Sequence, residues 1–202
     1  MDLQSERSAA GFFPYPEDEE ILLSPAVVEP ADTTLAKTRL KYRIREATED
    51  DISVVMGLVR QLAVYEKLIG SYTPNEELYR RYGWGEEAIF KVLLAENEGD
   101  EGPDYLGLAL YYFTFSTFVG KPTLWLEDIF VPEELRGWGI GTALLRRLAQ
   151  IALEKDCGRM EWTVLDWNEP SRQYYFSLGA KAMDEWTTFR LTPPEIKRLA
   201  EA

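Results

Sequence analysis

An arginine and three glycines lie directly in front of a run of apolar residues with helical spacing. They are Arg136, Gly137, Gly139 and Gly141, in the stretch "RGWGIG". A helix whose first turn lacks side chains leaves bare backbone N–H groups at the positive end of its dipole, which favours an anion such as phosphate. The spacing matches neither the G-x-G-x-x-G of a dinucleotide-binding turn nor the G-K-[ST] ending of a P-loop. The loop therefore indicates a site for another phosphate group or, alternatively, a plain strand-to-helix turn.

Carboxylates and tyrosines are the other residues able to do chemistry. The chain contains no histidine and a single cysteine, Cys157, so Ser-His and Cys-His mechanisms are excluded and the commonest zinc ligand is missing. We expect no metal site, and we expect proton transfer to depend on carboxylates, tyrosines or water. The candidates are Glu127 and Asp128 in "LEDIFV", and Tyr174 and Tyr175 in "WNEPSRQYY". Because adjacent strand positions point to opposite faces, we expect only one of the two carboxylates to face a given side of the sheet.

The overall composition indicates one acidic globular domain. The chain has 202 residues, 46% of them hydrophobic, and a formal net charge of −13, and this length can bury a full core. The acidic charge argues against nucleic acid as a partner and permits a cationic ligand. The single cysteine fits a reducing, cytoplasmic compartment, and we expect neither a signal peptide nor a membrane span. Residues 1–38 mix prolines, acids and apolar residues without period, so we expect a poorly ordered extension before a domain at 39–202.

The elements that must position these residues follow from the periodicity of the apolar side chains. Strands are expected at 40–47, 88–96, 105–115, 122–131, 159–167 and 180–191, and helices at 48–68, 73–83, 140–155, 169–179 and 193–202. Thr48 and Asp51 form a capping-box pattern at the start of the first helix. This order of elements indicates a mixed sheet covered by helices, in the α/β class with an α+β type of mixed sheet.

Several motifs together resemble the GNAT family of acetyl-CoA-dependent N-acetyltransferases. A strand ending "LEDIFVP" runs into R-x-x-G-x-G and a helix, and "LAVYEKL", "YYFTF" and "WNEPSRQYY" resemble the diamine (spermidine/spermine) branch, which includes thialysine acetyltransferases. The resemblance covers roughly residues 40–191. It implies the acyl-CoA N-acyltransferase fold, a central mixed sheet flanked by helices. In that fold a β-bulge splays two strands and opens a slot for coenzyme A.

The resemblance also implies which residues bind acetyl-CoA. The backbone at a strand end would pair with the pantetheine arm, the N–H groups of the glycine loop would hold the pyrophosphate, and the motif beginning "NEPS" would complete the site. These residues are Ile129, Phe130 and Val131; Arg136, Gly137, Trp138, Gly139, Ile140, Gly141 and Thr142; and Asn168, Glu169, Pro170 and Ser171. Trp138 has a second interpretation as a surface or interface residue, and Asn168 with Pro170 has one as the start of a helix.

The implied reaction is attack of a neutral amine on a thioester. At pH 7 only about one alkylamine molecule in 10³ is neutral, so deprotonation costs roughly 4–5 kcal/mol. The resemblance implies that Glu127 acts as the base through water and that Tyr175 acts as the acid for the leaving thiolate. The residues implied for amine binding, through charge and cation–π contact, are Tyr65, Glu66, Glu127, Asp128 and Trp167. The alternative is that these residues are solvated carboxylates and core aromatics.

We therefore expect an enzyme that transfers acetyl from acetyl-CoA to a primary amine of a small polyamine, by direct attack in a ternary complex. Three alternatives stay open: a thialysine or other lysine-like substrate, a protein substrate, and a regulatory protein that binds coenzyme A without turnover. The resemblance implies a homodimer. We expect no nucleic-acid or membrane partner.

Overall fold

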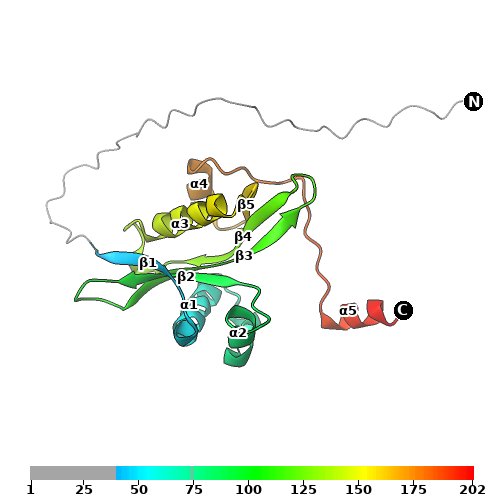
Figure 1. Cartoon of the computed structure of the whole chain (residues 1–202), viewed down its shortest axis with the longest axis horizontal. Helices are drawn as coiled ribbons and strands as arrows, with labels where there is room; N and C mark the ends of the chain where they lie inside the picture. The colour runs from blue at the N-terminus through cyan, green and yellow to red at the C-terminus, as the bar shows by residue number, and fades with distance from the viewer. Residues whose placement is uncertain (1–39, 74) are drawn as a thin grey trace, which may run out of the picture. The chain divides into compact units, whose positions relative to one another are not determined.

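A five-stranded sheet with helices on both faces forms the body of the protein (Figure 1). The computed structural model describes residues 40–73 and 75–202, so the extension expected at residues 1–38 lies outside the described residues. The strands are β1 (Tyr42–Glu46), β2 (Lys91–Asn97), β3 (Tyr105–Ser116), β4 (Lys121–Phe130) and β5 (Arg159–Trp162), and the α-helices are α1 (Ile52–Tyr65), α2 (Glu76–Gly83), α3 (Ile140–Glu154), α4 (Glu169–Ser177) and α5 (Pro193–Ala200). None of the helices in the described part is long and apolar enough to cross a membrane.

The sheet is mixed, as the sequence predicts. Its spatial order is β1-β2-β3-β4-β5, with antiparallel pairing from β1 to β4 and parallel pairing between β4 and β5. The expected hairpin between β2 and β3 is present. Its turn is held by the Asn97 side-chain amide, which donates to the carbonyl oxygens of Glu101 and Pro103.

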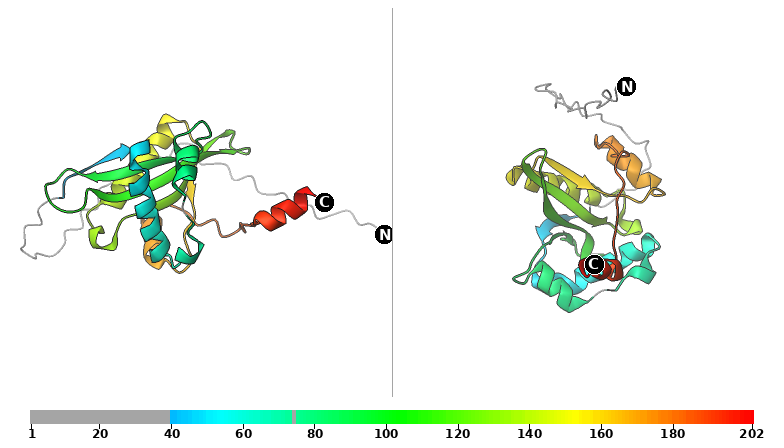
Figure 2. Two further views of the ribbon diagram at one scale, coloured as in Figure 1. Left: turned by 90° about the horizontal axis from the view of Figure 1, so that it is seen from below. Right: turned by 90° about the vertical axis from the view of Figure 1, so that its right-hand side faces the viewer.

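Each face of the sheet has its own apolar layer, and the two views of Figure 2 show α1 and α2 on the face opposite α3. On the α1 face, the buried Val55 and Leu62 of α1 pack with Leu108 of β3. On the α3 face, Leu144 of α3 packs with Leu124 of β4. Burying a leucine side chain contributes about 1.5–3 kcal/mol. The central strands are covered on both faces, which explains why β3 appears in the sequence as a nearly continuous apolar run.

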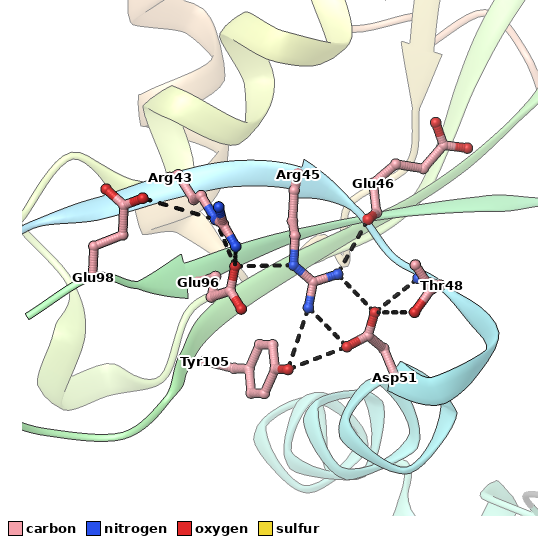
Figure 3. A network of polar contacts seen from close by, with 8 residues as sticks. All are labelled: Arg43, Arg45, Glu46, Thr48, Asp51, Glu96, Glu98 and Tyr105. Carbon is pink, nitrogen blue, oxygen red and sulfur yellow. Dashed lines mark hydrogen bonds and ion pairs between the residues drawn. The ribbon is translucent and has the colours of Figure 1, made fainter.

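A polar network fixes the point at which α1 begins (Figure 3). The Asp51 carboxylate accepts two hydrogen bonds from the Arg45 guanidinium, at 2.7 and 2.8 Å, and one from the Thr48 amide at 2.7 Å. The Tyr105 hydroxyl donates to it at 3.2 Å. The Arg45 hydrogen bonds hold the pKa of Asp51 well below its ordinary value. The expected capping box is present, and it sets where the far end of α1 meets the pocket described below.

The predicted final strand is absent. Residues 180–191 form no strand, and β5 ends at Trp162 instead of continuing to residue 167. A strand requires a hydrogen-bonded neighbour as well as a suitable side-chain pattern, and no described strand pairs with this segment. Its apolar side chains are uncovered, with Trp186 73% and Phe189 92% exposed.

Candidate active site

A β-bulge in β4 sets the direction of the two adjacent carboxylates. Leu110 pairs with Asp128 and Tyr111 pairs with Leu126, so Glu127 is the extra residue in the ladder. A bulge restarts the alternation of side chains along a strand. The prediction that Glu127 and Asp128 face opposite sides of the sheet is therefore wrong, because it assumed an uninterrupted strand.

Both carboxylates lie on the α1 face. Tyr112 and Trp125 pair across β3 and β4, and both donate hydrogen bonds to the same Glu127 oxygen, at 3.1 Å from the tyrosine hydroxyl and 2.9 Å from the indole N–H. Asp128 is on the same face, within electrostatic range of Glu127 and of Glu66, which follows the last residue of α1. The bulge thus gathers three carboxylates on one side of the sheet.

A pocket of about 430 Å³ opens where β4 and β5 separate. Their pairing ends at Leu126 and Trp162, and the strand ends beyond that pair lie apart, as the splayed-strand expectation required. The pocket is lined by the ends of α1, β4 and β5, the start of α3, and α4. The predicted site residues that line it are Tyr65, Glu66, Glu127, Asp128, Ile129, Phe130, Val131, Arg136, Gly137, Ile140, Gly141, Thr142, Asn168, Pro170, Ser171 and Tyr175.

Four predicted residues lie outside the pocket lining. Gly139 is the N-cap of α3, and Trp138 packs against the apolar layer of the α3 face. Trp167 contacts the Tyr65 ring, with centroids 5.9 Å apart. The Glu169 carboxylate accepts a hydrogen bond from the side-chain amide of Gln173 on α4. Trp167 therefore contacts a residue of the pocket lining without lining the pocket itself.

The glycine loop has a backbone conformation that is unfavourable for residues with a side chain. Gly137 and Gly139 both have φ of 80°, in the left-handed region where residues with a Cβ are strained. As an N-cap, Gly139 provides no side-chain acceptor to the first turn of α3, so the bare amides expected from the sequence are present at this end. Since Gly141 and Thr142 line the pocket, this helix end is suited to an anion there.

Gly107 of β3 allows the end of β4 to come close, and sequence reasoning missed it. A Cβ at this position would lie 2.6 Å from the Phe130 carbonyl oxygen and 3.1 Å from the Val131 side chain. A glycine inside a strand pattern often marks a close backbone approach, and this was the available signal in the sequence. Gly107 thus fixes the path of the residues expected to pair with pantetheine.

Tyr175 projects from α4, which begins as the sequence predicts. The Asn168 side chain accepts a hydrogen bond from the Ser171 amide and caps the helix. The Tyr175 ring packs against Trp162 with centroids 5.1 Å apart. Burial raises the pKa of Tyr175 to about 12, so its hydroxyl is protonated at neutral pH. It therefore holds a proton that an acid could donate, and burial makes it a weaker acid than a free tyrosine.

Tyr174 is also part of the pocket lining. Its hydroxyl lies 2.8 Å from the Thr142 hydroxyl, which joins α4 to the first turn of α3. Helical geometry places Tyr174 about 100° from Tyr175, but a contact between two residues 32 positions apart on different helices leaves no pattern in the sequence. The other lining residues that sequence reasoning missed are Leu62, Leu126, Leu135, Leu145, Trp162, Thr163 and Val164.

The carboxylates on the α1 face of the pocket have no ion-pair partner in the described part of the chain. Burial, followed by the charges of Glu127 and Glu66, raises the pKa of Asp128 to about 6. Burial also raises the pKa of Glu66. Within residues 40–73 and 75–202, no lysine or arginine forms an ion pair with these three groups. A group of carboxylates without an ion-pair partner, two of them partly buried, favours a positively charged ligand.

Known proteins are similar to this chain in sequence and in architecture. The chain matches the model of the acetyltransferase (GNAT) family over residues 59–180. It is 40% identical over 164 residues to a thialysine N-epsilon-acetyltransferase of Bos taurus, covering 78% of this chain and 96% of that protein. It is 33% identical over 165 residues to the spermidine/spermine N(1)-acetyltransferase-like protein 1 of Homo sapiens, covering 79% of this chain and 24% of that protein.

Solved structures agree with the fold. An integron cassette protein from the mobile metagenome of V. cholerae superposes with a TM-score of 0.66 and 25% identity, covering 80% of this chain and 98% of that one. The bulged strand, the splayed strand ends and the bare helix end lie together at one pocket. With the family match over most of the described domain, they lead to one conclusion: the chain belongs to the GNAT family and is an acetyl-CoA-dependent N-acetyltransferase.

Proposed function

We propose that the enzyme acetylates a primary amine of a small polyamine such as spermidine or spermine. The observation that carries this proposal is the group of three pocket carboxylates, Glu66, Glu127 and Asp128, with no ion-pair partner among the described residues. An extended polycation would supply several ammonium groups to such a surface. The relative whose name refers to spermidine and spermine supports the same class of substrate.

Acetyl-CoA would occupy the opposite side of the pocket, along β4 and the start of α3. The strand end at Ile129–Val131 lies beyond the last pair with β5, so its backbone is available to the amide groups of the pantetheine arm. The pyrophosphate would lie at Gly137–Thr142, where the left-handed glycines and uncapped amides suit an anion. Arg136 would add a guanidinium, which binds phosphate through two parallel hydrogen bonds.

The proposed proton transfers use one carboxylate and one tyrosine. An ammonium group held at the carboxylates loses a proton to Glu127 through a water molecule, and the neutral nitrogen then attacks the thioester carbonyl carbon. The carbon–sulfur bond breaks, and the departing thiolate takes the hydroxyl proton of Tyr175. The phenolate that remains recovers a proton from the newly acylated nitrogen, so one proton is released to solvent for each acetyl group transferred. The position of Tyr175 in the pocket lining supports this role, and its hydroxyl carries a proton at neutral pH, as that of a free tyrosine does.

Thialysine, or another lysine-like amine, is the second candidate substrate. A relative with 40% identity over nearly its whole length carries that name. Such a substrate would use the same acetyl-CoA site and the same tyrosine, and only the length and charge spacing of the amine would differ.

The experiment is to measure release of the coenzyme A thiol from acetyl-CoA with spermidine, spermine, putrescine, thialysine and lysine. Spermidine or spermine is expected to give the highest kcat/KM. Tyr175→Phe is expected to lower kcat by about 10²–10⁴-fold, the usual contribution of a positioned acid or base. Tyr174→Phe is the matched variant: it loses the Thr142 contact and is expected to raise KM for acetyl-CoA while largely keeping kcat.

Each outcome separates the candidates. A clear preference for thialysine would replace the polyamine substrate and keep the mechanism. No thiol release with any amine, despite binding of acetyl-CoA, would contradict the enzyme's proposed small-amine substrate. Equal loss of kcat in both tyrosine variants would contradict the assignment of Tyr175 as the acid.

We also propose that the protein is a cytoplasmic homodimer. The exposed Trp186 and Phe189 support a second copy that covers this segment, and the single cysteine fits a reducing compartment. Light scattering after gel filtration should give twice the mass of one chain, and a Trp186→Ser, Phe189→Ser double variant should shift that mass toward one chain. A monomeric parent protein would contradict the dimer.

A further inference from the structure

Two aromatic rings that are expected to contact the amine already form cation–π contacts with cationic side chains of the protein itself. The Arg136 guanidinium carbon lies 4.5 Å from the centroid of the Tyr65 ring. The Lys67 ammonium lies 5.4 Å from the centroid of the Trp167 ring. A cation over an exposed aromatic face is stabilised by about 0.5–1 kcal/mol. Of the two ring–cation pairs, only Tyr65 with Arg136 lines the pocket.

Arg136 is held over Tyr65 by few contacts. Its Nε donates a hydrogen bond to the Val131 carbonyl oxygen at 3.1 Å, and Val131 belongs to the strand end expected to pair with pantetheine. Across the described parts of the chain, no carboxylate forms an ion pair with Arg136. The guanidinium therefore bridges the two sides of the pocket through one ring face and one carbonyl oxygen.

This position conflicts with the binding of a cationic substrate. An ammonium group arriving at Tyr65 would meet an occupied ring face and a like charge at the same point. A pyrophosphate at the start of α3 is a stronger partner for the guanidinium than a ring face, because charge-assisted bidentate hydrogen bonds exceed a cation–π contact in strength. Residue 136 immediately precedes that loop, and Arg136, Gly137 and Tyr65 all line the pocket, so the exposed side chain lies close to both partners.

We propose that Arg136 is a placeholder cation that couples the two substrate sites. Without acetyl-CoA it occupies the face of Tyr65, and when acetyl-CoA binds it moves to the pyrophosphate and leaves that face to the amine. The inference rests on the proposed positions of the amine and the pyrophosphate. Acetyl-CoA then favours amine binding, and by thermodynamic linkage the amine favours acetyl-CoA binding by the same factor.

The test is calorimetric titration of the full chain with spermidine, in the absence and presence of saturating coenzyme A, which lacks the acetyl group and so prevents turnover. For the wild type, coenzyme A should tighten spermidine binding by about three- to tenfold, the range that a cation–π contact and like-charge repulsion provide. Arg136→Gln should bind spermidine more tightly than the wild type when coenzyme A is absent. Coenzyme A should then add little further.

Arg81 offers a control for net charge, although it also forms an ion pair with Glu87. Its guanidinium lies 5.2 Å from the centroid of the Tyr82 ring, outside the pocket lining, and Arg81→Gln changes the net charge by the same amount. This variant should show the wild-type coupling. A gain of spermidine affinity in both variants would attribute the effect to net charge alone and would overturn the inference.

The sign of the effect distinguishes a placeholder from a residue that only binds the cofactor. Unchanged or weaker spermidine binding by Arg136→Gln without coenzyme A overturns the inference while the proposed function stands. If the wild type binds none of the panel amines, with or without coenzyme A, the proposed function fails and the inference fails with it. Arg136 is exposed, so the variant is expected to fold, and its unfolding temperature checks this.

Discussion

Replacing Asp128 with asparagine is expected to stabilise the folded protein at alkaline pH while lowering its activity. Burial, with the charges of Glu127 and Glu66, raises the pKa of Asp128 from 3.8 to about 6. The folded state therefore binds the proton more tightly than the unfolded state. The stability that this tighter proton binding at Asp128 contributes is fully present below pH 3.8 and is lost as the pH rises through about 6.

The size of the effect follows from the pKa difference. About two pKa units at about 1.36 kcal/mol each make the ionised Asp128 destabilising by roughly 3 kcal/mol at pH 8. At pH 5 the folded carboxyl is mostly protonated, and the same linkage leaves roughly half of that penalty. The penalties at the two pH values differ by about 1.4 kcal/mol. This difference reports the effect of the charge alone, because the packing of an asparagine at this position does not depend on pH.

The assay is urea unfolding of the wild type and Asp128→Asn at pH 5 and pH 8. The free energy of unfolding of the variant, relative to the wild type, should be higher at pH 8 than at pH 5 by about 1.4 kcal/mol. Glu127→Gln is the control, since it removes the adjacent but exposed carboxylate and should give a smaller change. A difference between variant and wild type that stays constant across this pH range would refute the buried-charge argument. Thiol release with spermidine should fall in Asp128→Asn, because the ammonium loses a partner.

Two further predictions concern the scaffold of the site. Asp51→Asn should lower the free energy of unfolding at pH 7 by about 3 kcal/mol, because it leaves the Arg45 guanidinium without its main partner. The lowered pKa of Asp51 means that the stabilisation by its ionised carboxylate is present above pH 3.8 and is lost as the pH falls below it. If urea unfolding showed Asp51→Asn to be as strongly destabilised at acid pH as at pH 7, the prediction would be contradicted. Gly107→Ala should weaken coenzyme A binding and destabilise the fold by about 1–3 kcal/mol, since its Cβ would lie 2.6 Å from the Phe130 carbonyl oxygen. Calorimetric affinity equal to that of the wild type would show that this close approach is not needed.

Local patterns in the chain predict most elements of the fold correctly. The spacing of apolar residues identifies α1 and α3, since a helix buries one stripe and that stripe is visible in the sequence. The capping residues Thr48 and Asn168 mark helix starts within one turn of themselves. The glycines of the loop after β4 indicate an anion site because a helix end without side chains is itself a local feature.

Contacts between segments that are far apart in the chain could not be predicted in the same way. The bulge at Glu127 depends on the register between β3 and β4, and one extra residue there turns both carboxylates to the same face. The hydrogen bond between Thr142 and Tyr174 and the contact between Arg136 and Tyr65 join elements far apart in the chain. Periodicity contains no information about such partners.

The sequence by itself determined the family resemblance, the order of most elements and the residue types available for catalysis, because motifs and apolar periods are properties of short stretches of chain. Only the tertiary structure decided which carboxylates share the pocket, which cation lies on Tyr65, and that residues 180–191 pair with none of the described strands. Strand register and side-chain proximity are set by packing between elements. A change of one residue in that register reverses the face on which a side chain lies.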